Sequence, residues 1–287
     1  NYGFIILGTS LIAEAVHLFT SEYFSGLELL RPIILWIFLS RNEKVFFHKV
    51  RKTFLHWLPY LLVFLGYAYW RSVLFQGPGG EDRNAPVLLY QLIETPFQTG
   101  IQLLLVALKD SAIILFQSWS TALAPDVFQF SSFFARFVFL VIVVCIVVVN
   151  SILSKLNYVN QEDDAIGQAQ SWRKEASFLG IFALFLGTLP MWIIGKSIAV
   201  HKNQMAATRF GLPSMFGAAL ILIVLISYFI AERNKANLAV ALLVGLAIGV
   251  HLDNAHIYKF SWEKQVNLYQ QFAQRIPDLD PNTAVIS

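Results

Sequence analysis

Three arginines stand where an apolar stretch of the chain meets a polar segment. Arg71 lies in YAYWRSVLF near the end of one apolar run, and Arg209 lies in ATRFGLPSMFG just before another. Arg83, followed by Asn84, lies in the turn-rich loop GPGGEDRNAP. A guanidinium group can donate two parallel hydrogen bonds to a phosphate. The arginines therefore predict a site for a lipid head group or a lipid-linked phosphate, with ordinary interfacial anchoring as the alternative.

Glu22, Glu28 and Arg31 lie in a second charged segment, SEYFSGLELLRPIILW, beside an apolar run. Glu28 and Arg31 are three residues apart, so on a helix they are neighbours and can neutralise each other. Glu22 precedes the run and has no basic neighbour in the sequence. An acidic group is favourable at a helix N-terminus, but the lack of a local partner also makes Glu22 a candidate for a role in binding.

Other polar residues give weaker signals. Glu14 and His17 share one helix face inside an apolar run, where they form either a structural pair or part of a site. Lys109 and Asp110 are adjacent and point apart on a helix, which indicates an interface or a break. The six histidines are scattered without a paired ligand spacing, so neither a metal nor a cofactor is expected.

The composition indicates which elements must position these residues. Only 14% of the 287 residues are charged, and the mean hydropathy is +0.59, whereas soluble domains carry about 25% charged residues. Runs such as FVFLVIVVCIVVV do not alternate, which favours membrane helices over barrel strands. The expected fold is an all-α polytopic membrane protein with about seven to nine spanning or re-entrant helices. The net charge of +3 is too small to indicate nucleic-acid binding.

Apolar runs bounded by polar segments predict the spans. Residues 1–252 form the expected membrane domain, and residues 253–287 form a soluble tail that begins a further domain. The tail is predicted to contain an amphipathic helix, whose apolar face comprises Trp262, Val266, Tyr269 and Phe272. The predicted spans are Gly3–Phe19, Leu27–Leu39, Phe54–Phe75, Pro96–Phe116, Ser132–Ile152, Ser177–Ile194, Leu212–Ala231 and Ala236–His251.

Basic residues orient these spans. The loop Arg41–Lys52 is rich in lysine and arginine and is expected to be cytoplasmic, which places the loops Ser21–Gly26 and Gly77–Pro86 outside. The segment Pro86–Phe116 either crosses once or enters and returns, with a break at ETPFQTG. The re-entrant alternative is preferred because more basic loop residues then lie in the cytoplasm. It places the tail outside the plasma membrane, or an equivalent membrane, and brings the three arginines to one external face.

The order of these segments resembles the membrane part of the GT-C glycosyltransferases, which take a sugar from a polyprenyl- or dolichyl-phosphate. The nearest likeness is to O-mannosyltransferase-like proteins with trailing TPR repeats. Serine at Ser21 stands where that family has lysine, and Gln117–Ser118 stands where it has aspartate. Four matching segments lie between about Ala13 and Arg233. The first is TSEYFSGLELL, which contains Glu22, and the second is the span end at Arg71 together with the loop RNAP. The third is QSWS, and the fourth is AATRFGLPSMFG, which contains Arg209, Pro213 and Ser214.

The resemblance implies an integral membrane glycosyltransferase, or a degenerate relative of one, that transfers a sugar from a lipid-phosphate donor at the external face. Candidate residues for binding the donor are Glu22, Arg71, Arg83, Asn84 and Arg209, and the catalytic acid is expected upstream of Asn1. Membrane lipids and the polyprenyl-phosphate sugar are the expected partners. A relative without activity, a non-catalytic subunit bound to other proteins of a membrane complex, and a transporter are the alternatives.

Overall fold

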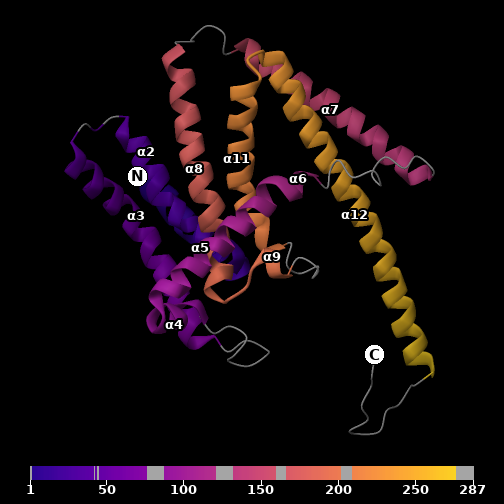
Figure 1. Cartoon of the computed structure of the whole chain (residues 1–287), viewed down its shortest axis with the longest axis horizontal. Helices are drawn as coiled ribbons and strands as arrows, with labels where there is room; N and C mark the ends of the chain where they lie inside the picture. Colours follow the sequence, from indigo (N-terminus) through magenta and orange to yellow (C-terminus); the bar gives the residue numbers. More distant parts are fainter. Residues whose placement is uncertain are drawn as a thin grey trace. The chain divides into compact units, whose positions relative to one another are not determined.

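The computed structural model describes residues 2–41, 43, 45–75, 87–120, 132–159, 166–201 and 209–275, and these residues form helices and no strand (Figure 1). Seven of the described helical segments are long and apolar enough to cross a membrane. They are Gly3–Thr20, Glu22–Ser40, Pro96–Gln117, Phe133–Leu156, Ser171–Ile193, Arg209–Phe229 and Arg233–Arg275. The prediction of an all-α polytopic membrane protein is therefore confirmed.

The chain divides into two compact units, of which the first comprises Asn1–Ser118 and Asn160–Glu232. Two of its short elements, η1 and η7, are 3-10 helices, and two others, η2 and η4, are π-helical turns. The elements of this unit are α1 (Tyr2–Thr20), η1 (Glu22–Leu30), α2 (Arg31–Ser40), α3 (Phe46–Tyr69), η2 (Trp70–Leu74), α4 (Val87–Glu94), α5 (Pro96–Ala112), η4 (Ile113–Gln117), α8 (Ile166–Ile193), α9 (Ile198–His201), η7 (Arg209–Gly211) and α11 (Leu212–Phe229). The three-residue helix α6 (Ser118–Ser120) follows η4.

Helices α8 and α11 lie side by side at the centre of this unit. A Cβ atom at Gly217 of α11 would lie 2.4 Å from the backbone nitrogen of Leu184 and 2.5 Å from the carbonyl oxygen of Gly180. Only glycine permits this approach, which is the way that small residues hold membrane helices together. A hydrogen bond of 2.7 Å between the buried hydroxyls of Thr188 and Ser214 also joins the pair.

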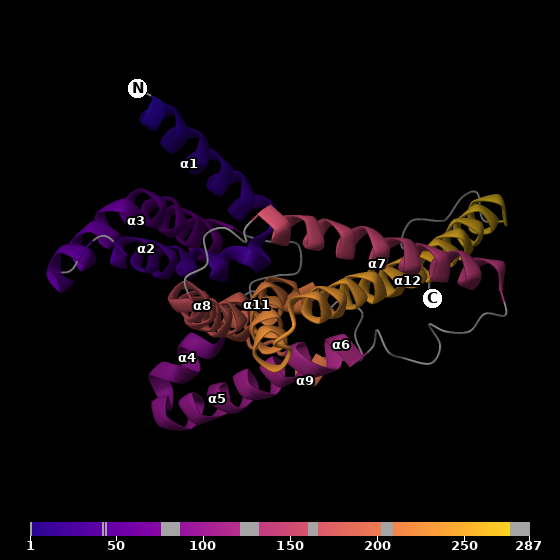
Figure 2. The ribbon, with the colours of Figure 1, turned by 90° about the horizontal axis from the view of Figure 1, so that it is seen from above.

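The remaining helices of the first unit flank this pair. Seen from above, α2 and α3 lie on one side of α8 and α11, and α4 and α5 lie on the other (Figure 2). The 3-10 helix η1 packs on α8 and buries Ser25, Gly26 and Leu30. Its two ends carry Glu22 and Glu28, so one short element positions both glutamates of the charged segment.

Two span boundaries need comment. The predicted span Phe54–Phe75 corresponds to the latter part of α3 and the π-helical turn η2 that follows it. This segment is not among the seven that are long and apolar enough to cross a membrane. A helix break falls between α4 and α5, at Thr95 and Pro96, inside the predicted ETPFQTG break. Because Pro96–Gln117 has 22 residues, it is long enough to cross alone. Whether the segment from Pro86 crosses once or re-enters stays a prediction.

The second unit comprises Trp119–Val159 and Arg233–Ser287, and its helices are α7 (Phe133–Val159) and α12 (Arg233–Arg275). They pack along each other, with Val138 and Ile142 of α7 and Ala241 of α12 buried. Helix α12 continues without interruption from the last predicted span into the predicted tail helix. The expected domain boundary at residue 252 therefore falls within one helix.

Candidate functional site

Glu22 and Arg71, both predicted site residues, form an ion pair. The Nε atom of Arg71 in η2 donates a hydrogen bond of 2.7 Å to the Oε2 atom of Glu22 in η1. The guanidinium group also lies over the Phe75 ring, 4.7 Å from its centroid. Glu22 lacked a partner in the sequence because Arg71 is 49 residues away along the chain. Both side chains remain partly exposed, 44% for Glu22 and 21% for Arg71.

Arg209 lies beside the residue that follows Glu22. Its guanidinium carbon is 5.3 Å from the ring centroid of Tyr23 and 5.4 Å from that of Phe210. The two rings contact each other at 5.3 Å. Because Glu22 and Tyr23 are adjacent in η1, this short helix brings Arg71 and Arg209 to the same end of the unit. That this end is external stays a prediction.

Lys196 is a third cation at this place, and sequence reasoning missed it. Its Nζ atom lies 5.9 Å from the centroid of the Phe210 ring, which it shares with Arg209. The turn before it is set by Gly195, whose φ of 71° is left-handed and favours glycine at the end of α8. A Gly-Lys pair directly after an apolar run was the available signal. Arg71, Lys196 and Arg209, with Glu22, Tyr23 and Phe210, are called the cationic rim below.

Asp110 of α5 holds the turn that carries Lys196. Its carboxylate is fully buried. It accepts hydrogen bonds from Trp192 Nε1 at 2.8 Å and Ser197 Oγ at 2.9 Å. It also accepts from the backbone N–H groups of Ile198 at 3.2 Å and Ala199 at 2.8 Å. Asp110 thus ties α5 to the end of α8 and the start of α9, at an interface as the sequence indicated.

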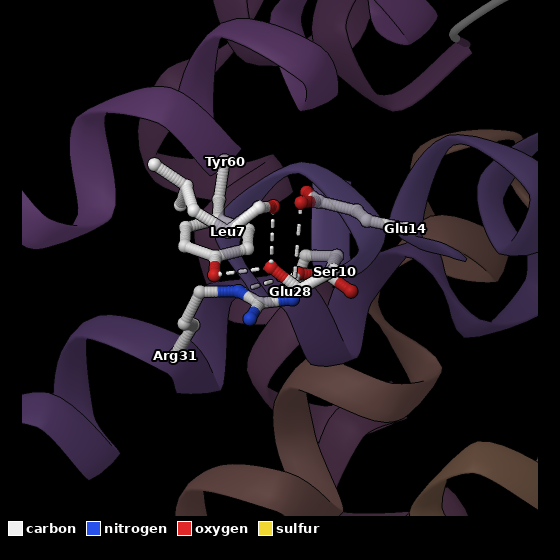
Figure 3. A network of polar contacts seen from close by, with 6 residues as sticks. All are labelled: Leu7, Ser10, Glu14, Glu28, Arg31 and Tyr60. Carbon is white, nitrogen blue, oxygen red and sulfur yellow. Dashed lines mark hydrogen bonds and ion pairs between the residues drawn. The ribbon is translucent and has the colours of Figure 1, made fainter. Parts of the chain in front are cut away.

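A second polar cluster, inside the first unit, comprises Glu14, Glu28 and Arg31 (Figure 3). The predicted pair is confirmed, because Arg31 donates from Nε at 3.0 Å and from Nη2 at 2.8 Å to Oε2 of Glu28. Oε2 of Glu14 lies 3.9 Å from the same Nη2 atom. His17 instead meets the Phe24 ring, with centroids 5.7 Å apart. Glu14 therefore faces Arg31 and not the histidine on its own helix.

The charges of the cationic rim favour an anion. The rim has three cationic side chains and one carboxylate, that of Glu22, which pairs with Arg71. Neither Lys196 nor Arg209 forms an ion pair with an acidic residue in the described part of the chain. The rim can therefore supply charged donors to a phosphate. It supplies no evident general base, because its one carboxylate, that of Glu22, is held by Arg71.

The other predicted features have the following outcomes. Arg83 and Asn84 lie outside the described residues. Among the described residues, no three histidine, cysteine, aspartate or glutamate side chains gather in a way that could hold a metal ion. In the second unit, an open pocket of about 520 Å³ is lined by Asn150, Ser154, Asn234, Lys235 and Leu238.

No model of a protein family, no curated protein and no solved structure matches this chain. The resemblance to the GT-C glycosyltransferases therefore rests on the short sequence segments that carry Glu22, Arg71 and Arg209.

Proposed function

We propose that the chain binds the phosphate of a lipid-linked sugar at the cationic rim and takes part in transferring that sugar. The observation that carries this proposal is the pairing of consecutive residues of η1 with two arginines, Glu22 with Arg71 and Tyr23 with Arg209. Lys196 adds a further cation over the same aromatic ring as Arg209. The order of these segments along the sequence, which resembles that of GT-C enzymes, supports the same conclusion.

The residues of the rim divide the work in the proposed reaction. Arg209 and Lys196 donate to the phosphate and stabilise the charge that develops on it as the sugar leaves. Arg71 contributes the same charge from the other side of Glu22, whose carboxylate positions its guanidinium group. The base that deprotonates the acceptor hydroxyl comes from a residue outside this rim. We place the rim at the external face of the plasma membrane or an equivalent membrane, following the basic cytoplasmic loop Arg41–Lys52.

Binding of a radiolabelled polyprenyl phosphate to the full chain in lipid nanodiscs tests the proposal. Replacing Arg209 or Lys196 by alanine is expected to raise the Kd about tenfold or more, since a charged hydrogen bond contributes about 1.5–3 kcal/mol. The matched control is Arg41→Ala, which removes a 63% exposed arginine that pairs with Glu175. Polyprenol without phosphate is the ligand control, and no variant should change its binding.

Turnover of a polyprenyl-phosphate sugar is the second readout. Arg71→Ala and Arg209→Ala should both lower it below the Arg41→Ala control. Unchanged phosphate binding in Arg209→Ala and Lys196→Ala would rule out the rim as the phosphate site. Normal phosphate binding without any sugar transfer would instead support a relative that has lost activity.

A role as a non-catalytic subunit of a membrane complex is the second candidate. The observation in its favour is the exposed apolar surface on α12 beyond the last predicted span, where Trp262 is 66% and Tyr269 is 70% exposed. Such surface often marks a protein contact. Stoichiometric co-purification with other membrane proteins that is lost in Trp262→Ser, together with absent sugar transfer, would favour this function.

A further inference from the structure

Two carboxylates share one arginine in the cluster of Glu14, Glu28 and Arg31. The Nη2 atom of Arg31 is 2.8 Å from Glu28 and 3.9 Å from Glu14 (Figure 3). The cluster joins three elements of the first unit, because the residues belong to α1, η1 and α2. If both carboxylates were ionised, the cluster would carry one net negative charge.

The two carboxylates are not equivalent. Glu28 receives two hydrogen bonds from Arg31 and is its ion-pair partner. Glu14 has a side chain that is only 1% exposed, and neither of its oxygens has a hydrogen-bond donor among the described residues. Figure 3 shows this carboxyl group directed at the Glu28–Arg31 pair.

Among the described residues, the surroundings of Glu14 offer no second cation. The ionisable groups that face it are Glu28 from η1, Arg31 from α2 and Tyr60 from α3. The hydroxyl of Tyr60 is 2.7 Å from that of Ser10, and its ring lies under the Arg31 guanidinium group at 3.9 Å. An uncompensated charge in an apolar interior costs several kcal/mol, and such a group usually becomes neutral instead.

We propose that Glu14 is a proton-binding site, in which an exchangeable proton neutralises its own carboxylate beside the Glu28–Arg31 pair, which is already neutral. The proton gives Glu14 a donor of its own, directed at the pair that its side chain faces. Glu28 and Arg31 form the less buried side of the cluster, since their side chains are 15% and 31% exposed. This site is separate from the cationic rim and does not depend on phosphate binding.

Infrared difference spectroscopy of the full chain in nanodiscs tests the proposal through the C=O band of protonated carboxyl groups. At about pH 6 an ordinary glutamate, with a pKa near 4.3, is ionised and gives no such band. We expect one band in the wild type that shifts in heavy water and disappears toward about pH 9. Glu14→Gln should abolish it, and the matched control Glu175→Gln, which removes a carboxylate paired with Arg41, should leave it unchanged.

Changing the number of charges in the cluster gives a sharper test, because a purely structural role of Glu14 would not predict the changes in the band. Glu28→Gln should also abolish the band, because the remaining carboxylate then balances Arg31 and needs no proton. Arg31→Met should increase the band to about twice its area, because both carboxyl groups then need a proton. Three results would overturn the proposal. The first is a wild type without a band at about pH 6, and the second is a band that persists in Glu14→Gln. The third is a band that is unchanged in both Glu28→Gln and Arg31→Met.

Discussion

Asp110 and Glu14 are both buried acidic side chains on helices of the first unit, and they differ in what surrounds their oxygens. Asp110 accepts four hydrogen bonds, from one indole, one hydroxyl and two backbone N–H groups. Glu14 has no hydrogen-bond donor among the described residues and shares a single arginine with Glu28. Burial alone therefore does not identify a functional carboxylate in this protein.

The difference lies in how each negative charge is stabilised. Four donors fixed by the backbone and by packed side chains can stabilise an ionised Asp110 without a cation, as backbone dipoles do at helix N-termini. Glu14 depends on a cation that another carboxylate already occupies. We therefore expect Asp110 to be a fixed structural contact, whereas Glu14 is the group that can exchange a proton.

The largest effect is expected for Asp110→Asn. The amide replaces one of the two acceptor oxygens with an NH2 group, so two of the four donors lose their acceptor and the free energy of unfolding should fall by about 3–5 kcal/mol. Unfolding in mixed detergent micelles measures this loss. Ser111→Ala is the matched control, because the neighbouring buried hydroxyl has no partner among the described residues and its removal should change little. Equal stability of the two variants would show that Asp110 is not a stabilising structural contact.

Arg31→Met should come next. Removing the guanidinium group leaves two carboxylates without a cation, and we expect a loss of about 1–3 kcal/mol at about pH 9, discounted because Arg31 is partly exposed. The loss should be smaller at about pH 6, where both carboxyl groups can take up protons. Arg41→Met, at an exposed pair, should show little change at either pH. A loss that is the same at both pH values would contradict the shared-arginine interpretation.

Glu14→Gln tests whether Glu14, in contrast to Asp110, makes the stability of the protein depend on pH. The folded wild type retains a proton that the unfolded chain releases, so its free energy of unfolding should fall by on the order of 1–2 kcal/mol from about pH 6 to about pH 9. Glutamine imitates the protonated side chain, and the variant should lose this pH dependence. Thermal unfolding at both pH values measures the difference, and Glu175→Gln should behave as the wild type does.

Ser10→Ala removes one hydroxyl from the edge of the Glu14 cluster. The Ser10–Tyr60 hydrogen bond of 2.7 Å joins α1 to α3, and its loss should cost about 0.5–1 kcal/mol, the range found for hydrogen bonds between membrane helices. Thr9→Ala is a matched control, because the described contacts of that hydroxyl are to carbonyls of its own helix. Identical unfolding of the two variants would show that the link between α1 and α3 contributes nothing.

The smallest effect, with the opposite sign of pH dependence, is expected at Glu43. A hydrogen bond from Lys52 holds the pKa of this carboxyl below its usual value. The pair therefore contributes stability above the pKa of the unfolded chain, and this contribution is lost as the pH falls. Glu43→Gln should weaken the fall in stability on the acidic side without affecting the change between about pH 6 and about pH 9, and added salt should reduce the difference.

The sequence predicted the helices and the local pairs well, because both depend on nearby residues. The spans follow from hydropathy, and the Glu28–Arg31 pair follows from helical spacing. The convergence of Glu22, Arg71 and Arg209 on one end of the unit followed from an assumed topology. The orientation of the chain in the membrane stays a prediction.

Contacts between distant segments could not be predicted in the same way. Asp110 meets donors 82 to 89 residues further along the chain, and no local pattern indicates where α8 ends beside it. The turn that carries Lys196 to the rim is held by that contact and by the left-handed Gly195. Glu14 and Arg31 meet because the short helix η1 reverses the chain between α1 and α2, and hydropathy carries no information about that geometry.

The unbroken helix α12 has a mechanical consequence. At 1.5 Å per residue, the part of α12 beyond residue 252 reaches about 35 Å past the apolar stretch. Membrane helices tilt by about 20° on average, and tilt depends on bilayer thickness. A change of that size would move Arg275 sideways by about 12 Å if the helix stays straight. In a straight helix a change of tilt therefore displaces the far end most, so the position of Arg275 depends more strongly on tilt than that of any residue within the apolar stretch.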